Sequence, residues 1–262
     1  MLPVDADFIR KVAPRFSGKP AEAQAAIISA IGPVLAATLE RYDIGTPLRI
    51  AHFMGQVTHE CAGFRTTQEF ASGAAYEGRR DLGNTQAGDG RRFKGRGLLQ
   101  LTGRANYKTY GEALGIDLVN QPERAAEPVL SLVIACEYWT RRAINKAADA
   151  DDLVAATRLV NGGQNGLDER GAYLRKAKAA LAEMRAVVVA AQEGGLTPVL
   201  RRGSHDDAVG ELQSLLRAKG HPVAVDNDFG AATELAVIAF QRAHGLEADG
   251  IVGRRTWEAL RA

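Results

Sequence analysis

The sequence predicts a mainly α protein built from two domains. Apolar residues recur at three-to-four spacing over residues 1–185, and alanine-rich segments such as 21–30 favour helix strongly. A Gly-Gly-x-x-Pro stretch that ends at Pro198 is typical of a linker. The chain beyond it repeats a short glycine-containing motif. We therefore expect domains over residues 1–185 and 199–262, joined by a linker over 186–198.

Composition excludes several classes of protein. The 262 residues are 46% hydrophobic and 24% charged, as in an ordinary soluble globular protein. The net charge of +2 gives no electrostatic case for nucleic acid as a partner. No apolar run approaches the roughly eighteen residues of a membrane span, so we expect no membrane insertion. Cys61 and Cys136 lie in apolar helical patterns and are expected to be free, buried thiols.

Proline and glycine divide the first domain into helices. We expect two or three short helices over residues 5–42, where Gly32-Pro33 is one of the interruptions, and later helices over 105–114, 123–142, 151–160 and 168–184. Repeated glycines interrupt residues 63–97. A long segment without regular structure is usually functional in a compact domain, so we interpret it as the lip of a cleft. The alternative is a disordered excursion.

The helix that follows Pro47 ends in two candidate catalytic residues. Its apolar stripe consists of Ile50, Phe53, Met54, Val57 and Cys61. Glu60 lies at the edge of this stripe, whereas His52 and His59 should project to the opposite, wetter side. Glu69 follows nine positions later among polar residues. A single glutamate at a helix edge is more often a solvated surface residue. Two carboxyl groups in unlike surroundings, however, are what glycosidic bond cleavage requires.

Polar and aromatic residues after the glycine-rich segment suit a sugar. The Gly-x-Gly pattern at 95–97 lacks the third glycine of a dinucleotide-binding loop. Gln100, Thr102 and Asn106 instead offer amide and hydroxyl groups beside the ring of Tyr107. Amides pair with the N-acetyl arm of an amino sugar, and an aromatic ring stacks on its pyranose face.

Arg170 stands in the first turn of the helix predicted over 168–184, just after an Asn-Gly-Gly loop at 161–163. The helix dipole disfavours a cation at this end of a helix. We therefore expect a specific anionic partner for Arg170, such as a carboxylate.

With these motifs, residues from about 50 to 181 resemble glycoside hydrolase family 19, in particular its phage-endolysin-like bacterial branch. The resemblance rests on His59-Glu60, Glu69, the run from Gly95 to Tyr107, and Asn161-Gly-Gly163. Tyr76-Glu77-Gly78-Arg79 and Asp81-Leu82-Gly83-Asn84 are typical of the branch. The resemblance implies a lysozyme-like, bilobal helical catalytic domain.

The resemblance also implies a role for each residue. Glu60 would be the general acid, and Glu69 the base that activates water with inversion at the anomeric carbon. Thr102 would help to hold this water, and Arg170 would neutralise the catalytic carboxylates. The expected substrate-binding residues are Tyr76, Gln100, Asn106, Tyr107 and Asn161. Plant chitinases of the family commonly carry a glutamate where this chain has Asn165, so the charge network around Arg170 should differ. Glu77 remains an alternative base.

The C-terminal residues 199–262 resemble the three-helix peptidoglycan-binding module. Its signature lies in Leu212-Gln213, Phe240-Gln241 and an internal repeat that relates 228–237 to 250–260. Within this repeat we expect Thr233 and Thr256 to cap the helices that follow them.

We therefore predict an endolysin-like cell-wall hydrolase, a monomer without cofactor or metal, that cleaves β-1,4 bonds of peptidoglycan as a muramidase does. A chitinase is the alternative. A zinc peptidase is disfavoured because His59-Glu60 is not followed by the second histidine of His-Glu-x-x-His. A catalytically dead wall-binding protein is disfavoured because both glutamates are present. The N-terminus lacks the pattern of a secretory signal, so we expect synthesis in the cytoplasm and holin-type release to the wall.

Overall fold

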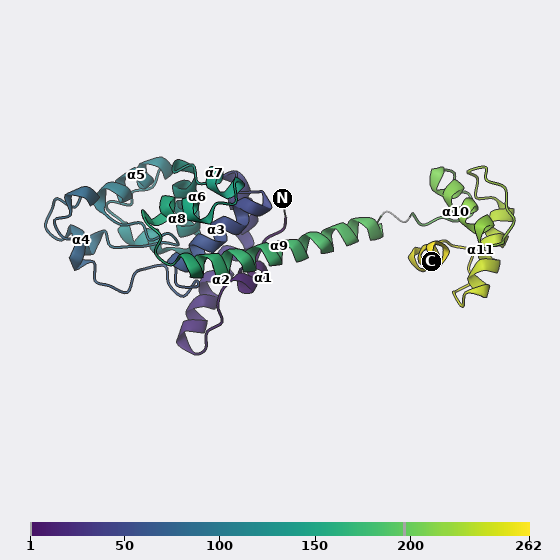
Figure 1. Ribbon diagram of the computed structural model, residues 1–262, viewed down its shortest axis with the longest axis horizontal. Helices are drawn as coiled ribbons and strands as arrows, with labels where there is room; N and C mark the ends of the chain where they lie inside the picture. The colour runs from purple at the N-terminus through teal and green to yellow at the C-terminus, as the bar shows by residue number, and fades with distance from the viewer. Residues whose placement is uncertain (1, 196–197) are drawn as a thin grey trace. The chain divides into compact units, whose positions relative to one another are not determined.

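The computed structural model describes the backbone of residues 2–195 and 198–262, with side chains over 2–188 and 198–262. These residues form helices and turns, with isolated β-bridges in place of strands, which confirms the mainly α prediction. The chain divides into two compact units, Met1–Arg185 and Ala186–Ala262 (Figure 1). Each unit has its own hydrophobic core.

The first unit contains helices α1 to α8, three short 3-10 turns and the part of α9 up to Arg185. Their bounds are α1 Ala6–Val12, α2 Lys19–Arg41, α3 Pro47–Glu60, η1 Ala74–Tyr76, η2 Arg80–Leu82, α4 Asp89–Arg92, α5 Arg104–Leu114, η3 Pro122–Ala126, α6 Pro128–Arg141, α7 Asn145–Asp149, α8 Leu153–Asn161 and α9 Leu167–Gly195. Helix α9 continues through most of the stretch expected to be a linker, because the alanines, Gln192 and Glu193 are compatible with helix until Gly194 and Gly195.

Helix α2 runs through Pro33, so the sequence prediction of an interruption there was wrong. Proline removes one backbone hydrogen bond and frees the carbonyl four residues earlier, here that of Ser29. Pro33 and Ser29 both lie on the exposed side of α2, where water can reach the freed carbonyl. Gly32 lies on the other side, and a Cβ there would come within 2.6 Å of the Ala6 Cβ. The glycine thus permits close packing of α1 against α2.

Helix α2 is also long and apolar enough to cross a membrane. This finding qualifies the expectation from sequence that no segment has the length and composition of a membrane span. In the structure one face of α2 is buried, including Ile28, Ile31, Leu35 and Leu39. This face packs against α1 and α6. Helix α2 therefore acts here as a core helix of the first unit.

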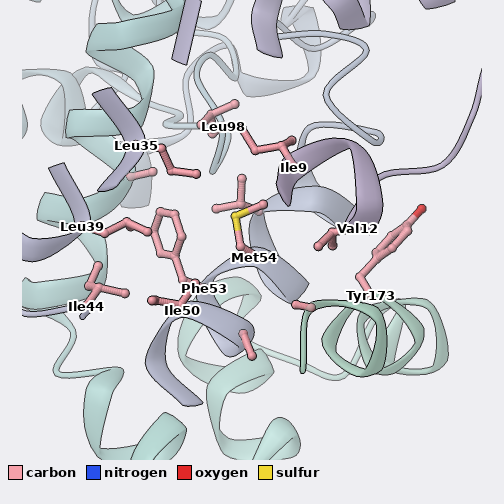
Figure 2. Packing of buried hydrophobic residues seen from close by; sticks show 14 of the residues in the cluster. Ile9, Val12, Leu35, Leu39, Ile44, Ile50, Phe53, Met54, Leu98 and Tyr173 are labelled. Carbon is pink, nitrogen blue, oxygen red and sulfur yellow. The ribbon is translucent and has the colours of Figure 1, made fainter. Parts of the chain in front are cut away.

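Helix α3 lies in the larger of two apolar clusters in the first unit. Figure 2 shows Phe53 and Met54 of α3 among Leu35, Leu39 and Ile9. The ring of Phe53 meets Trp139 of α6 edge-on, with 5.3 Å between the ring centroids. Cys61 and Cys136 are free and buried in this cluster, as predicted, and burial raises the pKa of both thiols.

A second apolar cluster is formed by residues between 93 and 134. It contains Phe93, Leu101, Tyr107, Tyr110, Leu118, Ala125, Leu130 and Ile134. Helix α6 contributes to both clusters, with Trp139 in the larger one and Ile134 in the smaller one. The unit therefore has two lobes, as expected, and α6 joins them.

The glycine-rich segment 63–97 is folded rather than extended into solvent. Asp89 is almost fully buried and accepts two hydrogen bonds from the Arg104 guanidinium, at 2.5 and 2.9 Å. This contact with Arg104 holds the pKa of Asp89 below its usual range. Asn84, also buried, accepts from the Arg104 backbone N–H and donates to the Tyr76 carbonyl. These contacts fix the segment onto α5 and remove the alternative of a disordered excursion.

The second unit contains α10 Asp207–Ala218, α11 Ala231–Ala243 and α12 Arg254–Arg261. Its repeat is organised around two buried glutamines. The Gln213 amide donates to the Asp228 carbonyl and the Thr233 hydroxyl, and its oxygen accepts from two backbone N–H groups. Gln241 likewise donates to the Ile251 carbonyl and Thr256, and accepts from the Gly250 N–H. The expectation that the two threonines cap helices was wrong. Gly230 and Gly253 are the N-cap residues, and each threonine lies within the first turn, where its hydroxyl accepts from the glutamine amide.

Candidate active site

Glu60 is the last residue of α3. The helix stops there because Ala62 and Gly63 take left-handed backbone angles, with φ of +51° and +73°. A Cβ on Gly63 would also lie 2.5 Å from the Pro14 Cγ, so the close turn requires glycine. The carboxyl group of Glu60 is therefore held at a fixed helix end with its side chain 19% exposed.

Arg170, in the first turn of α9, pairs with Glu60. Its guanidinium lies almost completely buried, with Nη2 2.5 Å from the Glu60 Oε1. The other donors bind the Gln56 side-chain oxygen at 2.6 Å and the Asn165 carbonyl at 3.0 Å. Asn165 thus contributes its backbone rather than a carboxylate. Among the described residues, Glu60 is the one acid in an ion pair with Arg170.

His59, at the end of α3, contacts both the loop before α9 and the first turn of α9. Its Nδ1 lies 2.6 Å from the Glu169 Oε2, and the other oxygen of Glu169 accepts from the Tyr173 hydroxyl. The imidazole packs so closely on Gly166 that a Cβ there would lie 2.2 Å from the His59 Cε1. His52, which was expected to face solvent, is fully buried with its Nε2 2.8 Å from the Asp151 Oδ1. The apolar stripe of α3 is broader than sequence spacing indicated, so it includes His52.

Glu69 is held by donors from two segments of the folded loop. The Tyr76 hydroxyl donates to Oε2 and the Gly95 N–H donates to Oε1, both at 2.9 Å. The Glu69 backbone N–H in turn donates to the Gly95 carbonyl. Burial and the hydrogen bond to Glu69 raise the pKa of Tyr76, which keeps its proton on the phenol. These two donors fix the orientation of the Glu69 carboxyl group.

Gly95 brings three predicted site residues together. A Cβ at this glycine would lie 2.9 Å from the Gln100 Oε1 and 3.3 Å from both the Glu69 Cδ and the Thr102 Oγ1. Gln100 reaches this place with a left-handed backbone, φ +52°, which is uncommon for a residue other than glycine. Such a conformation is found where the surrounding structure demands it, often at functional sites.

Most of the predicted site residues line an open cleft of about 420 Å³. Its lining includes Glu60, Gln100, Thr102, Asn106 and Asn161. Sequence reasoning did not place the other seven lining residues in the site, which are Leu82, Leu99, Leu101, Tyr138, Arg142, Val160 and Gly162. Arg142 follows α6 directly, and no motif marked it. Glu69 and Tyr76 do not line the cleft. The Glu69 carboxyl group lies close to Gly95, as do the side chains of Gln100 and Thr102, which line the cleft.

Tyr107 cannot contact a substrate as predicted. It is fully buried, with its hydroxyl donating to the Lys94 carbonyl and accepting from Arg96. Burial raises the pKa of Tyr107 to about 12. Asn106 lines the cleft, and the next position on a helix turns by roughly 100° into the smaller apolar cluster. The ring is therefore a core residue.

Glu77, the alternative base, is engaged in holding the loop. Its two carboxylate oxygens accept from the backbone N–H groups of Gly88 and Gly90, at 2.7 and 2.8 Å. Glu69, in contrast, shares with Thr102 the space around Gly95, which favours Glu69 over Glu77 as the base. Within the described part of the chain, no cluster of three or more His, Cys, Asp or Glu side chains could hold a metal ion.

Two family models match the chain. Residues 25–159 match the glycoside hydrolase family 19 model, described as chitinase class I, and residues 205–260 match a putative peptidoglycan binding domain. The first match covers more than half of the chain.

Curated relatives match parts of the chain. A glycosyl hydrolase family 19 domain-containing protein of Haemophilus influenzae is 37% identical over 103 residues, which are 39% of this chain and 49% of that protein. An acidic 27 kDa endochitinase of Solanum lycopersicum is 37% identical over 114 residues, covering 42% and 43%. A zinc D-Ala-D-Ala carboxypeptidase of Streptomyces albus G is 44% identical over 66 residues, covering 23% and 25%. The chain thus spans less than half the length of these relatives.

Solved structures show the same fold. Chitinase C of Streptomyces griseus has a TM-score of 0.50 at 20% identity, covering 69% of this chain and 77% of that one. A class IV chitinase of Zea mays has a TM-score of 0.51 at 23% identity, covering 69% and 92%. The family match, the shared fold and the second match together show that this chain is a glycoside hydrolase of family 19 with a C-terminal peptidoglycan-binding domain.

Proposed function

We propose that this protein is an endolysin-like hydrolase that cleaves β-1,4-glycosidic bonds of the peptidoglycan glycan strand. The observation that carries the proposal is the presence of a family 19 domain and a peptidoglycan-binding domain in one chain. A wall-binding domain raises the effective concentration of the catalytic domain on an insoluble polymer. Bacterial peptidoglycan is thus the partner, bound by both domains.

In the proposed mechanism Glu60 protonates the leaving glycosidic oxygen. Arg170 binds only the Oε1 atom, and the Oε2 atom has no protein partner among the described residues. The proton is carried to the substrate from Oε2, and Glu60 then becomes an anion beside a buried guanidinium. Arg170 therefore stabilises the charge that develops on the acid as the bond breaks.

Glu69 acts as the base in this mechanism. Its carboxylate is fixed by Tyr76 and Gly95, yet each oxygen keeps a further lone pair for a water. Thr102 lies beside it and donates to the Gln100 carbonyl, so its hydroxyl oxygen is free to accept from that water. Attack on the face opposite the leaving group inverts the anomeric carbon. Gln100, Asn106 and Asn161 bind the sugars along the cleft.

A chitinase is the second candidate, because the tomato relative is named an endochitinase. The same carboxyl groups would cleave N-acetylglucosamine polymers. Purified sacculi and chitin oligomers are therefore digested in parallel, and the products are reduced with borohydride and identified by mass spectrometry. Reduced N-acetylmuramic acid ends with poor chitin cleavage support the proposal. Efficient chitin cleavage with intact sacculi supports a chitinase instead.

The acid is tested by Glu60→Gln, which keeps the shape of the side chain but cannot supply the proton. We expect loss of lysis with wall binding retained, as measured by turbidity of sacculi and by sedimentation with them. Glu69→Gln should behave in the same way. Lysis by Glu60→Gln at a rate comparable to wild type would refute its assignment.

A further inference from the structure

Arg142 gives the cleft a charge that the proposed mechanism does not use. Arg142 is the one lysine or arginine among the residues that line the cleft. Arg170 pairs with Glu60 but is not itself one of the lining residues. In the described part of the chain no carboxylate forms an ion pair with Arg142, so its positive charge is uncompensated.

The structure holds Arg142 in place by contacts that leave its charge unneutralised. Its Nη1 donates to the Leu159 carbonyl at 3.1 Å, and the guanidinium carbon lies 4.5 Å from the centroid of the Tyr138 ring. Tyr138 is itself fixed, because its hydroxyl donates to the Val160 carbonyl at 2.7 Å. An arginine placed over a ring and bonded to one carbonyl has donors left for a ligand.

The chemistry of the two candidate substrates differs at this point. Chitin is an uncharged polymer of N-acetylglucosamine. Peptidoglycan bears carboxylates, either on its stem peptides or, where the peptide has been removed, on the lactyl group of muramic acid. A planar guanidinium pairs well with a carboxylate through two parallel hydrogen bonds.

We infer that Arg142 is a specificity-determining residue that binds a carboxylate of the peptidoglycan strand and so favours this substrate over chitin. The inference rests on the proposed function and deepens it. Arg142 lies on the same wall of the cleft as Asn161, since Leu159, Val160 and Asn161 end helix α8. The carboxylate would therefore be carried by a sugar bound near Asn161.

The test compares kcat/KM on three substrates: intact sacculi, glycan strands stripped of peptide by an amidase, and chitin oligomers. Arg142→Gln should lower the ratio of peptidoglycan to chitin cleavage by about twofold to fivefold, because Arg142 is exposed and a charge pair at an exposed site is weak. Arg142→Lys should retain part of the ratio. The preference of wild type for peptidoglycan over chitin should also weaken as the salt concentration is raised. The same rise in salt should have a smaller effect on Arg142→Gln.

Arg141 provides a matched control, because it is the neighbouring arginine, is exposed, and pairs with Glu137 at 2.6 Å without lining the cleft. Arg141→Gln should leave the substrate ratio at the wild-type value. An equal loss on all three substrates in Arg142→Gln, or no loss on any, overturns the inference. A loss confined to intact sacculi assigns the carboxylate to the peptide, and a loss on stripped strands assigns it to the lactyl group. Failure of wild type to cut any peptidoglycan refutes the proposed function instead.

Discussion

The buried ion pair between Arg170 and Glu60 allows a quantitative test by Arg170→Met. The substitution keeps an apolar stem but removes the guanidinium that binds Glu60, Gln56 and the Asn165 carbonyl. Removing one partner of a buried pair costs about 3–5 kcal/mol. The Glu60 side chain is 19% exposed, so water compensates in part and we expect a loss of roughly 3 kcal/mol.

For a domain of this size, each kcal/mol lowers the melting temperature by about 2–4 °C. Arg170→Met should therefore melt about 6–12 °C lower in differential scanning calorimetry of the full chain. Lysis should fall on the order of 100-fold, because a donor to the developing charge is lost.

A double-mutant cycle with Glu60→Gln isolates the charge interaction. In the Glu60→Gln background no carboxylate remains to be left unpaired, so the stability lost through Arg170→Met should be smaller by about 1–3 kcal/mol. Equal losses in the two backgrounds would show that the guanidinium stabilises the fold through Gln56 and Asn165, and the reasoning about the ion pair would fail.

Three further outcomes are expected. Gly166→Ala should reduce activity more than stability, because its Cβ displaces His59 and shifts the loop that follows Asn161, whose amide donates to the Asn165 carbonyl. Asp89→Asn should weaken the loss of folding stability at acid pH. Because the pKa of Asp89 is lowered in the folded protein, its ionised carboxylate stabilises the fold above the unfolded-state pKa of about 4. This stabilisation is lost as the pH falls through the folded-state pKa. Gln241→Ala should unfold the wall-binding unit and leave hydrolysis of soluble oligomers intact.

Each of these outcomes has its own check. Gly115→Ala has similar backbone strain, with φ +67° but no atom within 4 Å of the new Cβ, so its activity should stay near wild type. If it loses as much activity as Gly166→Ala, strain and not the His59 contact is responsible. Denaturant midpoints between pH 3 and 7 check Asp89→Asn, and parallel curves for variant and wild type would contradict the ion pair's role. Calorimetry and sedimentation with sacculi check Gln241→Ala, and a single joint transition would contradict separate unfolding.

Local patterns predicted the helices, the two cores and the position of Glu60, because burial at helical spacing is a property of neighbouring residues. Side-chain direction at single positions was harder to predict. Tyr107 has the chemistry of a sugar-stacking residue, but one step along α5 turns it away from the cleft. His52 is polar, yet its partner Asp151 lies 99 residues away in sequence. Arg142 belongs to no motif, and only the fold places it beside Asn161.

The paired glutamines of the C-terminal unit have a consequence for how this domain could vary. Gln213 and Gln241 bind the backbone of the loops that follow α10 and α11, in addition to Asp226, Asp249 and the two threonines. The loop conformations are therefore specified largely from inside the domain. Exposed side chains such as those of Val225 and Glu247 can therefore be substituted without altering the conformation of the loops that carry them. Such a domain can acquire affinity for a different wall polymer by surface substitution alone.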